Sequence, residues 1–445
     1  MAIKIARVRV NGQWYDLTLD PATRMWEAVI TAPGSSIHQP GGVYNLTLEA
    51  VNETGSTVTA DGSTFPGLLL PVRDVVRPVL TVVSPGPGTI TDNMAPVIVD
   101  VTDDDSGADM ETFSLAVDGV EVPAEHSPIP GGYRAIWTPT EPHSDGAHVI
   151  SARVTDYDGN TGETNGTFAV DTTPPRLSIF NRNFIVDTAT LEITGRTGDE
   201  TSPPVTVRVE CGEFAGSPDV QEDGSWAQEI PLTFGDNNIT VTATDAVGLS
   251  TVEELLVMRL VTDRTQEDVD RLKRLEDAGW AKMSESDRAW YMAEPCRGGY
   301  NAVDMNRVER ACAYLASILQ QAPASLRDYC KAVGMAWDKL YDMPYDPDDY
   351  YLTVKTDWNE HDEPPPWERA RYLSNVVRLS AAMEYDKPEL PRVLRWPHYY
   401  EVNNIELTLV RLSAAIGPYM EQSERLIDLA ALSRIYSGEA MAGEF

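Results

Sequence analysis

Cysteine and long apolar runs are both scarce in this sequence. Its 445 residues include four cysteines, and no two of them have the C-x-x-C spacing of a metal or redox site. No apolar run approaches the roughly 18 residues of a membrane span, and the N-terminal segment lacks the apolar core of a secretory signal. We therefore expect reduced, mostly buried thiols, no membrane insertion, and folding in a cytoplasm.

Basic residues are also few. The chain has 35 lysines and arginines against 69 aspartates and glutamates, which gives a net charge of −34. Such a surface repels the phosphates of nucleic acids and of anionic membranes, so neither is expected as a partner. The six histidines are scattered along the chain and indicate no metal site.

Recognisable catalytic motifs are missing. The sequence has no G-x-S-x-G, no H-E-x-x-H and no phosphate-binding loop. Asp346, Asp348 and Asp349 lie beside tyrosines, as acids do in sugar-binding loops, but a solvated acidic loop is the simpler interpretation. We therefore expect no catalytic residues, no enzymatic activity and no cofactor.

What the sequence does contain is a pattern repeated three times. Residues 42–55, 146–159 and 235–248 each carry apolar residues at every second position between two turn glycines. This pattern is typical of a β-strand with one buried face, entered and left by tight turns. A unit of this size repeated in tandem predicts a row of small β-sandwiches.

Two proline-containing junctions set the domain boundaries. The segments that begin at Asp74 and Asp171 echo each other, one repeat apart. We predict three tandem immunoglobulin-like β-sandwiches, over residues 1–72 (divergent), 73–171 and 172–262. Trp137 and Trp226 lie equally far before the aspartates that end the repeated strands, so we expect them at matching core positions.

The acidic run 103–109 raises the question of calcium. Calcium prefers several carboxylates on one loop, but this run lacks the spaced pattern and the bidentate glutamate of an EF-hand. An acidic turn between strands is the simpler interpretation, and calcium binding is the alternative.

Helical periodicity replaces the strand pattern at about residue 264. Residues 308–319, 372–383 and 405–416 each carry apolar side chains at i, i+4, i+7 and i+11, which gives one apolar stripe per helix. Thr265 and Ser284 precede acidic residues, as N-caps do. We predict a helical bundle over residues 263–445.

An aromatic segment interrupts this helical part. Residues 350–358 predict a short strand or an extended arm, which the three prolines 364–366 end. Extended segments can pair with a neighbour's sheet, and aromatic residues dominate many interfaces, so Tyr350, Tyr351, Trp358 and Trp367 are candidate partner-docking residues. The alternative is that Trp358 and its neighbours close the helical core.

Two resemblances follow from these segments. Residues 74–262 resemble bacterial immunoglobulin-like repeats, on residues 171–175, 223–226 and 238–245. Four later strings resemble segments of structural proteins of tailed phages and prophages of Gram-positive gut bacteria: residues 299–309, 355–358, 368–376 and 403–406. The second resemblance implies a tail-associated, baseplate-type virion protein, and it brings no catalytic residues.

The expected function is therefore that of a non-enzymatic structural protein of a phage virion. The sandwiches would form an arm for adhesion to host-surface glycans or for spacing, and the helical part would dock to other virion proteins. We expect a homo-oligomer in the tail of the particle, made in the cytoplasm of the bacterial host. The alternatives are a bacterial cell-surface adhesin and a virion-associated glycan hydrolase.

Overall fold

The computed structural model describes residues 2–31, 33–180, 185–332, 347–362, 364–395 and 397–417, without the side chains of residues 321–348. The chain divides into two compact units, Met1–Thr173 with Glu200–Ser202, and Pro174–Asp199 with Pro203–Phe445. No described helix is long and apolar enough to cross a membrane.

The described part of residues 1–72 forms a sheet that buries few apolar side chains. A four-stranded antiparallel sheet has the order β2-β1-β6-β7, and two small pairs accompany it, β3 with β4 and β5 with β8. The Asn11–Gly12 turn has positive φ at both residues and joins β1 to β2, as the hairpin signal predicts. Among the apolar residues described in this segment, only Ala6, Val10 and Val72 are buried. The strand bounds are β1 (Ile3–Val10), β2 (Gln13–Asp16), β3 (Thr18–Leu19), β4 (Trp26–Glu27), β5 (Val43–Asn45), β6 (Thr47–Asn52), β7 (Thr57–Asp61) and β8 (Leu69–Pro71).

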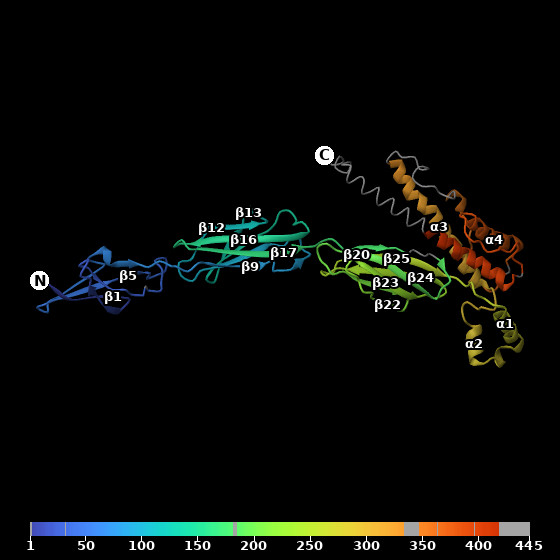
Figure 1. The fold of residues 1–445 in the computed structure, drawn as a ribbon, viewed down its shortest axis with the longest axis horizontal. Coiled ribbons are helices and arrows are strands. Elements are labelled where there is room, and N and C mark those ends of the chain that lie inside the picture. The colour runs from blue at the N-terminus through green and yellow to red at the C-terminus, as the bar shows by residue number, and fades with distance from the viewer. Residues whose placement is uncertain are drawn as a thin grey trace. The chain divides into compact units, whose positions relative to one another are not determined.

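Residues 79–170 form an immunoglobulin-like β-sandwich (Figure 1). One sheet has the order β14-β15-β11-β9 and the other β10-β17-β16-β12-β13, with β10 parallel to β17. Alternate residues of β16 are buried, among them Ile150, Ala152 and Val154, as the repeated pattern predicts. The strands are β9 (Val79–Ser84), β10 (Thr89–Ile90), β11 (Val97–Thr102), β12 (Ala108–Val117), β13 (Val120–Val122), β14 (Glu125–Ile129), β15 (Gly132–Trp137), β16 (Gly146–Asp156) and β17 (Thr161–Val170).

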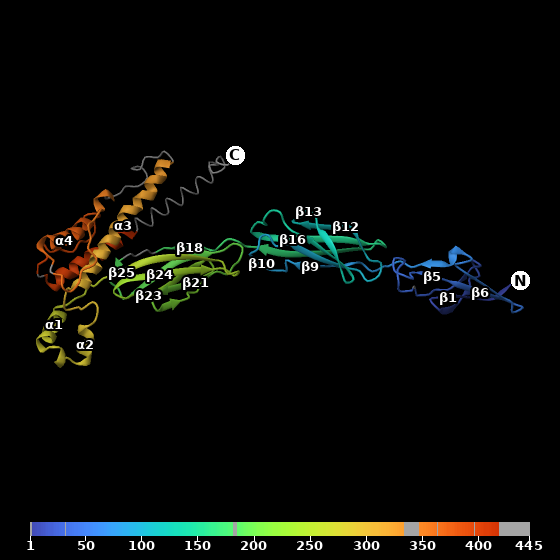
Figure 2. The ribbon, with the colours of Figure 1, turned by 180° about the vertical axis from the view of Figure 1, so that it is seen from behind.

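Residues 176–259 repeat this topology (Figure 2). The sheets are β18-β20-β23 and β19-β25-β24-β21-β22, and β19 is again parallel to β25. Immunoglobulin-like sandwiches followed by helices are therefore the fold class of this chain. The strands are β18 (Arg176–Ile179), β19 (Ile185–Val186), β20 (Thr190–Gly198), β21 (Thr206–Cys211), β22 (Phe214–Gly216), β23 (Ser225–Pro231), β24 (Gly235–Thr244) and β25 (Ser250–Arg259).

The expected match between Trp137 and Trp226 is wrong. The two lie on equivalent strands, β15 and β23, but Trp137 is the last residue of its strand and Trp226 the second of its own. Trp226 is fully buried over Gly195, whereas Trp137 is only partly buried. Equal spacing in sequence misled because the loop after β15 is longer than the loop after β23.

Helices follow from residue 266. Thr265 caps the first helix in a reciprocal capping box with Asp268, and the Ser284 hydroxyl accepts a hydrogen bond from the backbone N–H of Asp287. Helices α3 and α4 pack side by side (Figure 1). The helical elements are α1 (Gln266–Ala278), η2 (Trp280–Lys282), α2 (Glu285–Tyr291), α3 (Ala302–Ala332), η4 (Pro347–Tyr350), α4 (Pro366–Ser380) and a last helix over residues 399–417. A short turn, η1 (Pro66–Leu68), lies in the first unit.

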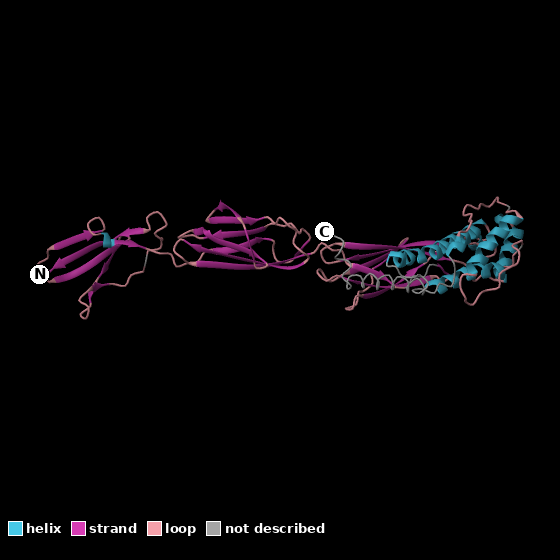
Figure 3. Ribbon diagram, turned by 90° about the horizontal axis from the view of Figure 1, so that it is seen from above, coloured by secondary structure: helices cyan, strands magenta, loops and turns pink. Residues whose placement is uncertain are grey.

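Strands and helices of the second unit, distinguished by colour in Figure 3, share one core. The predicted helical stripes, represented by Val308, Val376 and Ile405, are fully buried, and they pack in one cluster with Ile185 and Met258 of the sandwich. The boundary predicted at residues 262/263 therefore separates strands from helices in sequence but not in packing.

Candidate functional site

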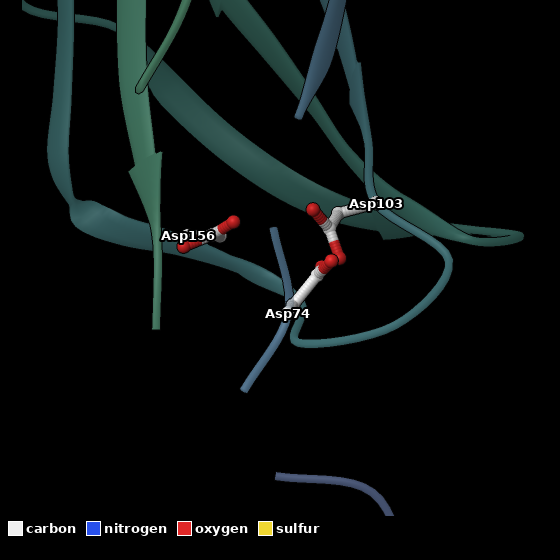
Figure 4. A group of neighbouring side chains, drawn as sticks. All are labelled: Asp74, Asp103 and Asp156. Carbon is white, nitrogen blue, oxygen red and sulfur yellow. The ribbon is translucent and has the colours of Figure 1, made fainter. Parts of the chain in front are cut away.

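Three carboxylates converge at one end of the first complete sandwich (Figure 4). Asp74, Asp103 and Asp156 each place a carboxylate oxygen within 4.8 Å of the others. Asp74 and Asp156 are buried, and Asp103 is partly buried. The three come from segments far apart in the sequence.

Tight turns hold two of these side chains in place. Asp103 follows β11, and its Oδ1 accepts hydrogen bonds from the backbone N–H groups of Asp105 and Gly107 at 3.1 and 2.7 Å. Asp156 ends β16, and its Oδ1 accepts from the N–H groups of Asp158 and Asn160 at 2.9 and 2.8 Å. The repeated turn after each strand thus fixes an acid at a set position.

The junction before β9 supplies the third carboxylate. Asp74 Oδ2 accepts from the backbone N–H and the hydroxyl of Ser106, both at 3.2 Å. Burial raises the pKa of Asp103, and the negative charges of Asp74 and Asp156 add to this shift against the hydrogen bonds of its own turn. Among the described residues, no lysine or arginine forms an ion pair with any of the three.

This donor set fits a hard divalent cation. Several carboxylate oxygens from flexible turns are the ligands that calcium prefers, whereas magnesium demands near-octahedral geometry and retains its waters. Burial is the main cause of the raised pKa of Asp103, and a calcium ion would offset both this burial cost and the smaller repulsion from Asp74 and Asp156. Binding a cation is the chemistry this arrangement can perform.

A loop of the first segment contacts the same turns. The Ser36 backbone N–H donates to Asp105 Oδ1 at 2.7 Å, and its hydroxyl donates to Asp158 Oδ2 at 2.6 Å. Asp158 Oδ2 also accepts from the backbone N–H of Asp74 at 2.7 Å. The acidic cluster therefore lies beside the junction that joins the first sheet to the sandwich.

Related features recur in the sandwich of residues 176–259. Asp199 follows β20 and Asp245 follows β24, and their carboxylate oxygens lie within 4.8 Å of each other. Asp245 Oδ1 accepts from the N–H groups of Val247 and Leu249, the same turn that Asp156 makes. Its buried Oδ2 has no hydrogen-bond partner among the described residues.

Sequence reasoning found only one member of the acidic cluster. Asp103 belongs to the acidic run in which calcium binding was the alternative, but Asp74 and Asp156 were noted only as a junction and as a strand end. One feature of the sequence could have revealed the cluster: an aspartate at the junction and an aspartate at the end of the repeated strand occur together in both sandwiches.

A second set of charges is buried where the sandwich of residues 176–259 meets the helices. Arg264, Asp304, Arg307 and Glu406, which we call the ionic cluster, are each at most 3% exposed in their side chains. Arg264 lies 2.8 Å from Asp304 and 2.9 Å from Glu406, and Arg307 lies 2.9 Å from Glu406. Two positive and two negative charges make the cluster neutral, which is how buried charges are tolerated.

The ionic cluster ties the end of the sandwich to two helices. Glu406 also accepts a hydrogen bond from the backbone N–H of Val261 at 2.7 Å. Asp304 and Arg307 belong to residues 299–309, and Glu406 to residues 403–406, two of the strings singled out in the sequence. In this structure those strings build the joint between sheet and helices.

Two of the four candidate docking residues are buried. Tyr350 and Trp358 lie in the helical core. The backbone N–H of Trp358 donates to Asn306 Oδ1, and its carbonyl oxygen accepts from Asn306 Nδ2, both at 2.8 Å. The docking prediction is wrong for these two, because their rings fill the core as the alternative held. Tyr351 and Trp367 are 70% and 66% exposed, and their docking role stays a prediction.

Residues 350–358 were expected to form a short strand or an extended arm, and the strand is absent from these described residues. Residues 351–358 have no regular secondary structure, and Asn306 satisfies the backbone of Trp358 in place of a neighbouring strand. Asp349 is exposed, the side chain of Asp348 is not described, and Asp346 lies outside the described residues.

Comparisons with known proteins agree with the fold. Residues 175–259 match the family described as glucodextranase, domain B. A search of curated proteins found no match.

Several solved structures are similar at low identity. The fibronectin(III)-like modules of CbhA from Clostridium thermocellum are 16% identical over 41% of this chain and 94% of theirs, with a TM-score of 0.25. A three-domain segment of titin is 11% identical over 59% and 88%, with a TM-score of 0.31. A Ca²⁺-stabilised, ice-binding adhesin of an Antarctic bacterium is 15% identical over 58% and 66%, with a TM-score of 0.26. The immunoglobulin-like fold is assigned from the strand order described above and not from these matches.

Proposed function

We propose that this chain is a non-enzymatic structural protein of a phage virion, associated with the tail or baseplate. The β-sandwiches form an arm that contacts host-surface glycans or sets a distance, and the helical part docks to neighbouring virion proteins. The arm and the docking part are functions of one polypeptide, so they need a firm joint.

The observation that supports the proposal most is this joint. The sandwich of residues 176–259 and the helices share a hydrophobic core, and the ionic cluster links Val261 to α3 and to the last helix. A catalytic domain on a tether would not need such a continuous core, whereas an arm held by a base does. Three residues of the joint, Asp304, Arg307 and Glu406, also lie in strings for which a resemblance to tail proteins was noted.

The test is the location of the chain in phage particles. Particles are purified from an induced lysogen that encodes an epitope-tagged chain, and the tag is located by immunogold labelling and mass spectrometry. Label on the tail, with none on the capsid, is the expected result. Recovery of the chain in the host envelope and its absence from particles would favour the cell-surface adhesin instead.

A separate assay addresses the glycan hydrolase. Purified full-length chain is incubated with host cell-wall glycan, and reducing sugar is measured. No release is expected. Release that a single Asp or Glu substitution abolishes would show that the non-enzymatic proposal is wrong.

A further inference from the structure

The helical part contains two adjacent cavities lined by arginine. Their volumes are about 530 and 390 Å³, and both are lined by Arg369, Leu394 and Arg395. Arg392 lines the smaller one. We call this pair of cavities the arginine cleft.

Within the part of the chain that the structure describes, the arginines of the cleft have no acidic partner. Among the described residues, none of the three forms an ion pair or a side-chain hydrogen bond, although the chain has about twice as many acidic as basic residues. The lining contains two acids: Asp362 pairs with Lys355 at 3.3 Å, and Glu360 lies 3.8 Å from His361 Nε2. The three guanidinium groups are therefore available to an anion from outside.

The rest of the lining is largely apolar. Tyr300, Met305 and Trp358 line the larger cavity, and Leu373 and Val393 line the smaller one. Val393 is 73% exposed, an unusual position for a branched apolar side chain. A ligand that fills the cleft therefore meets apolar walls as well as positive charge.

We propose that the arginine cleft binds an acidic peptide segment of a neighbouring virion protein. Guanidinium groups bind carboxylates through paired charge-assisted hydrogen bonds, and arginine with aromatic residues is the composition of interface hot spots. A bulky apolar side chain of the same peptide fills the space beside Leu373 and Leu394. The apolar lining favours a peptide over a phosphate polymer, which has no side chain to place there.

This inference rests on the proposed function, in which the helical part is the docking module. It names the part of the surface and the chemistry of the partner that carry the docking. A failure of this inference can be told apart from a failure of the proposed function. Labelling of the tail does not depend on which surface of the helical part docks to the neighbouring protein.

The experiment measures binding of a defined probe to the full-length chain. The probe is a fluorescein-labelled peptide of alternating glutamate and leucine, followed by fluorescence anisotropy at low salt. The double variant Arg369→Gln/Arg395→Gln is compared with Arg153→Gln/Arg208→Gln, which removes the same charge from exposed sandwich positions. Thermal melting confirms that both variants fold.

Saturable binding that weakens about tenfold or more in the cleft variant, and stays unchanged in the control variant, is the expected result. Equal weakening in both variants would reduce the interaction to general charge attraction and overturn the assignment. So would binding of the matched glutamine–leucine peptide with equal affinity. Tighter binding of inorganic polyphosphate at the same arginines would replace the peptide with a phosphate ligand.

Discussion

At the scale of single residues, a buried histidine gives the first complete sandwich a pH response. The ring nitrogens of His148 lie 2.7 Å from Asp118 Oδ2 and 2.8 Å from the Ser144 carbonyl oxygen. Burial alone would lower the pKa of His148, but these two acceptors raise it above its ordinary value. The charged ring can donate from both nitrogens, so these two acceptors stabilise it relative to the neutral ring.

The sign of the resulting effect on stability follows from this shift. The folded pKa lies above the unfolded value, so the pair contributes stability that is fully present below about pH 6.5 and is lost as pH rises through the folded pKa. Asp118→Asn should lower the pKa of His148, measured by NMR titration, and cost about 1 kcal/mol in mild acid, a figure kept low because Asp118 is half exposed. Glu121→Gln, an exposed neighbour, is the control. An unchanged titration in the Asp118 variant would contradict this account.

Trp226 owes its buried position to a glycine on the facing strand. A Cβ on Gly195 would lie 2.4 Å from the Trp226 ring and 2.4 Å from the Ser178 carbonyl oxygen, so Gly195→Ala should lower the free energy of unfolding by about 1–3 kcal/mol. Gly198→Ala on the same strand meets no atom within 4 Å and should have little effect. Equal melting temperatures for the two variants, by differential scanning calorimetry, would show that the core adapts freely.

At the scale of elements, the turns that present Asp74, Asp103 and Asp156 are expected to respond to calcium. Millimolar calcium should raise the melting temperature of the first unit, and EGTA should reverse the change. Asp103→Asn should abolish the shift, while Asp104→Asn, an exposed neighbour outside the cluster, should keep it. An equal calcium response in both variants would rule out these carboxylates as the ligands.

Without a cation the same turns should show a pH dependence of the same sign as that of His148, in a range that begins at lower pH. The pKa of Asp103 is raised, so the folded state binds more protons than the unfolded state above about pH 3.8, and stability falls as pH rises through the folded pKa. Calcium should remove this loss. Urea unfolding between mild acid and neutral pH, with and without calcium, measures the difference.

The ionic cluster predicts a large cost for the loss of one charge. Glu406→Gln leaves Arg264 and Arg307 with one carboxylate in a dry environment, so we expect a loss of about 3–5 kcal/mol in the stability of the second unit. Glu163→Gln breaks an exposed pair with Arg153 and should cost at most about 1 kcal/mol. Chemical denaturation followed by tryptophan fluorescence compares the two, and similar losses would mean that the cluster is hydrated.

Much of the element structure could be predicted from local patterns. Alternation around Ile150 and Ile239, the cap at Thr265 and the stripe through Val308 are each encoded within a few residues. The site could not be predicted in this way. Carboxylates from a junction, a loop and a strand end meet only after the sheets have formed. The different places of Trp137 and Trp226 in their strands were also not predictable, because they follow from the lengths of the loops after β15 and β23.

At the scale of the whole molecule, the packing decides where the chain can be divided. A fragment of residues 174–445 keeps the shared core intact, whereas one of 263–445 loses Ile185, Met258 and Leu260 from it. We expect the longer fragment to be monodisperse and to melt like the second unit of the full chain, and the shorter one to aggregate. Analytical ultracentrifugation with calorimetry tests this, and a cooperative transition in the shorter fragment would disprove it.

The long final strand of the sandwich of residues 176–259 has a mechanical consequence. β25 spans ten residues, pairs with β24 along its whole length, and leads directly to the residues that Glu406 and Arg264 hold. Tension along this strand loads its inter-strand hydrogen bonds in shear, so that they resist together rather than one after another. A pull on the sandwich therefore reaches the helices as a force that the sheet bears collectively.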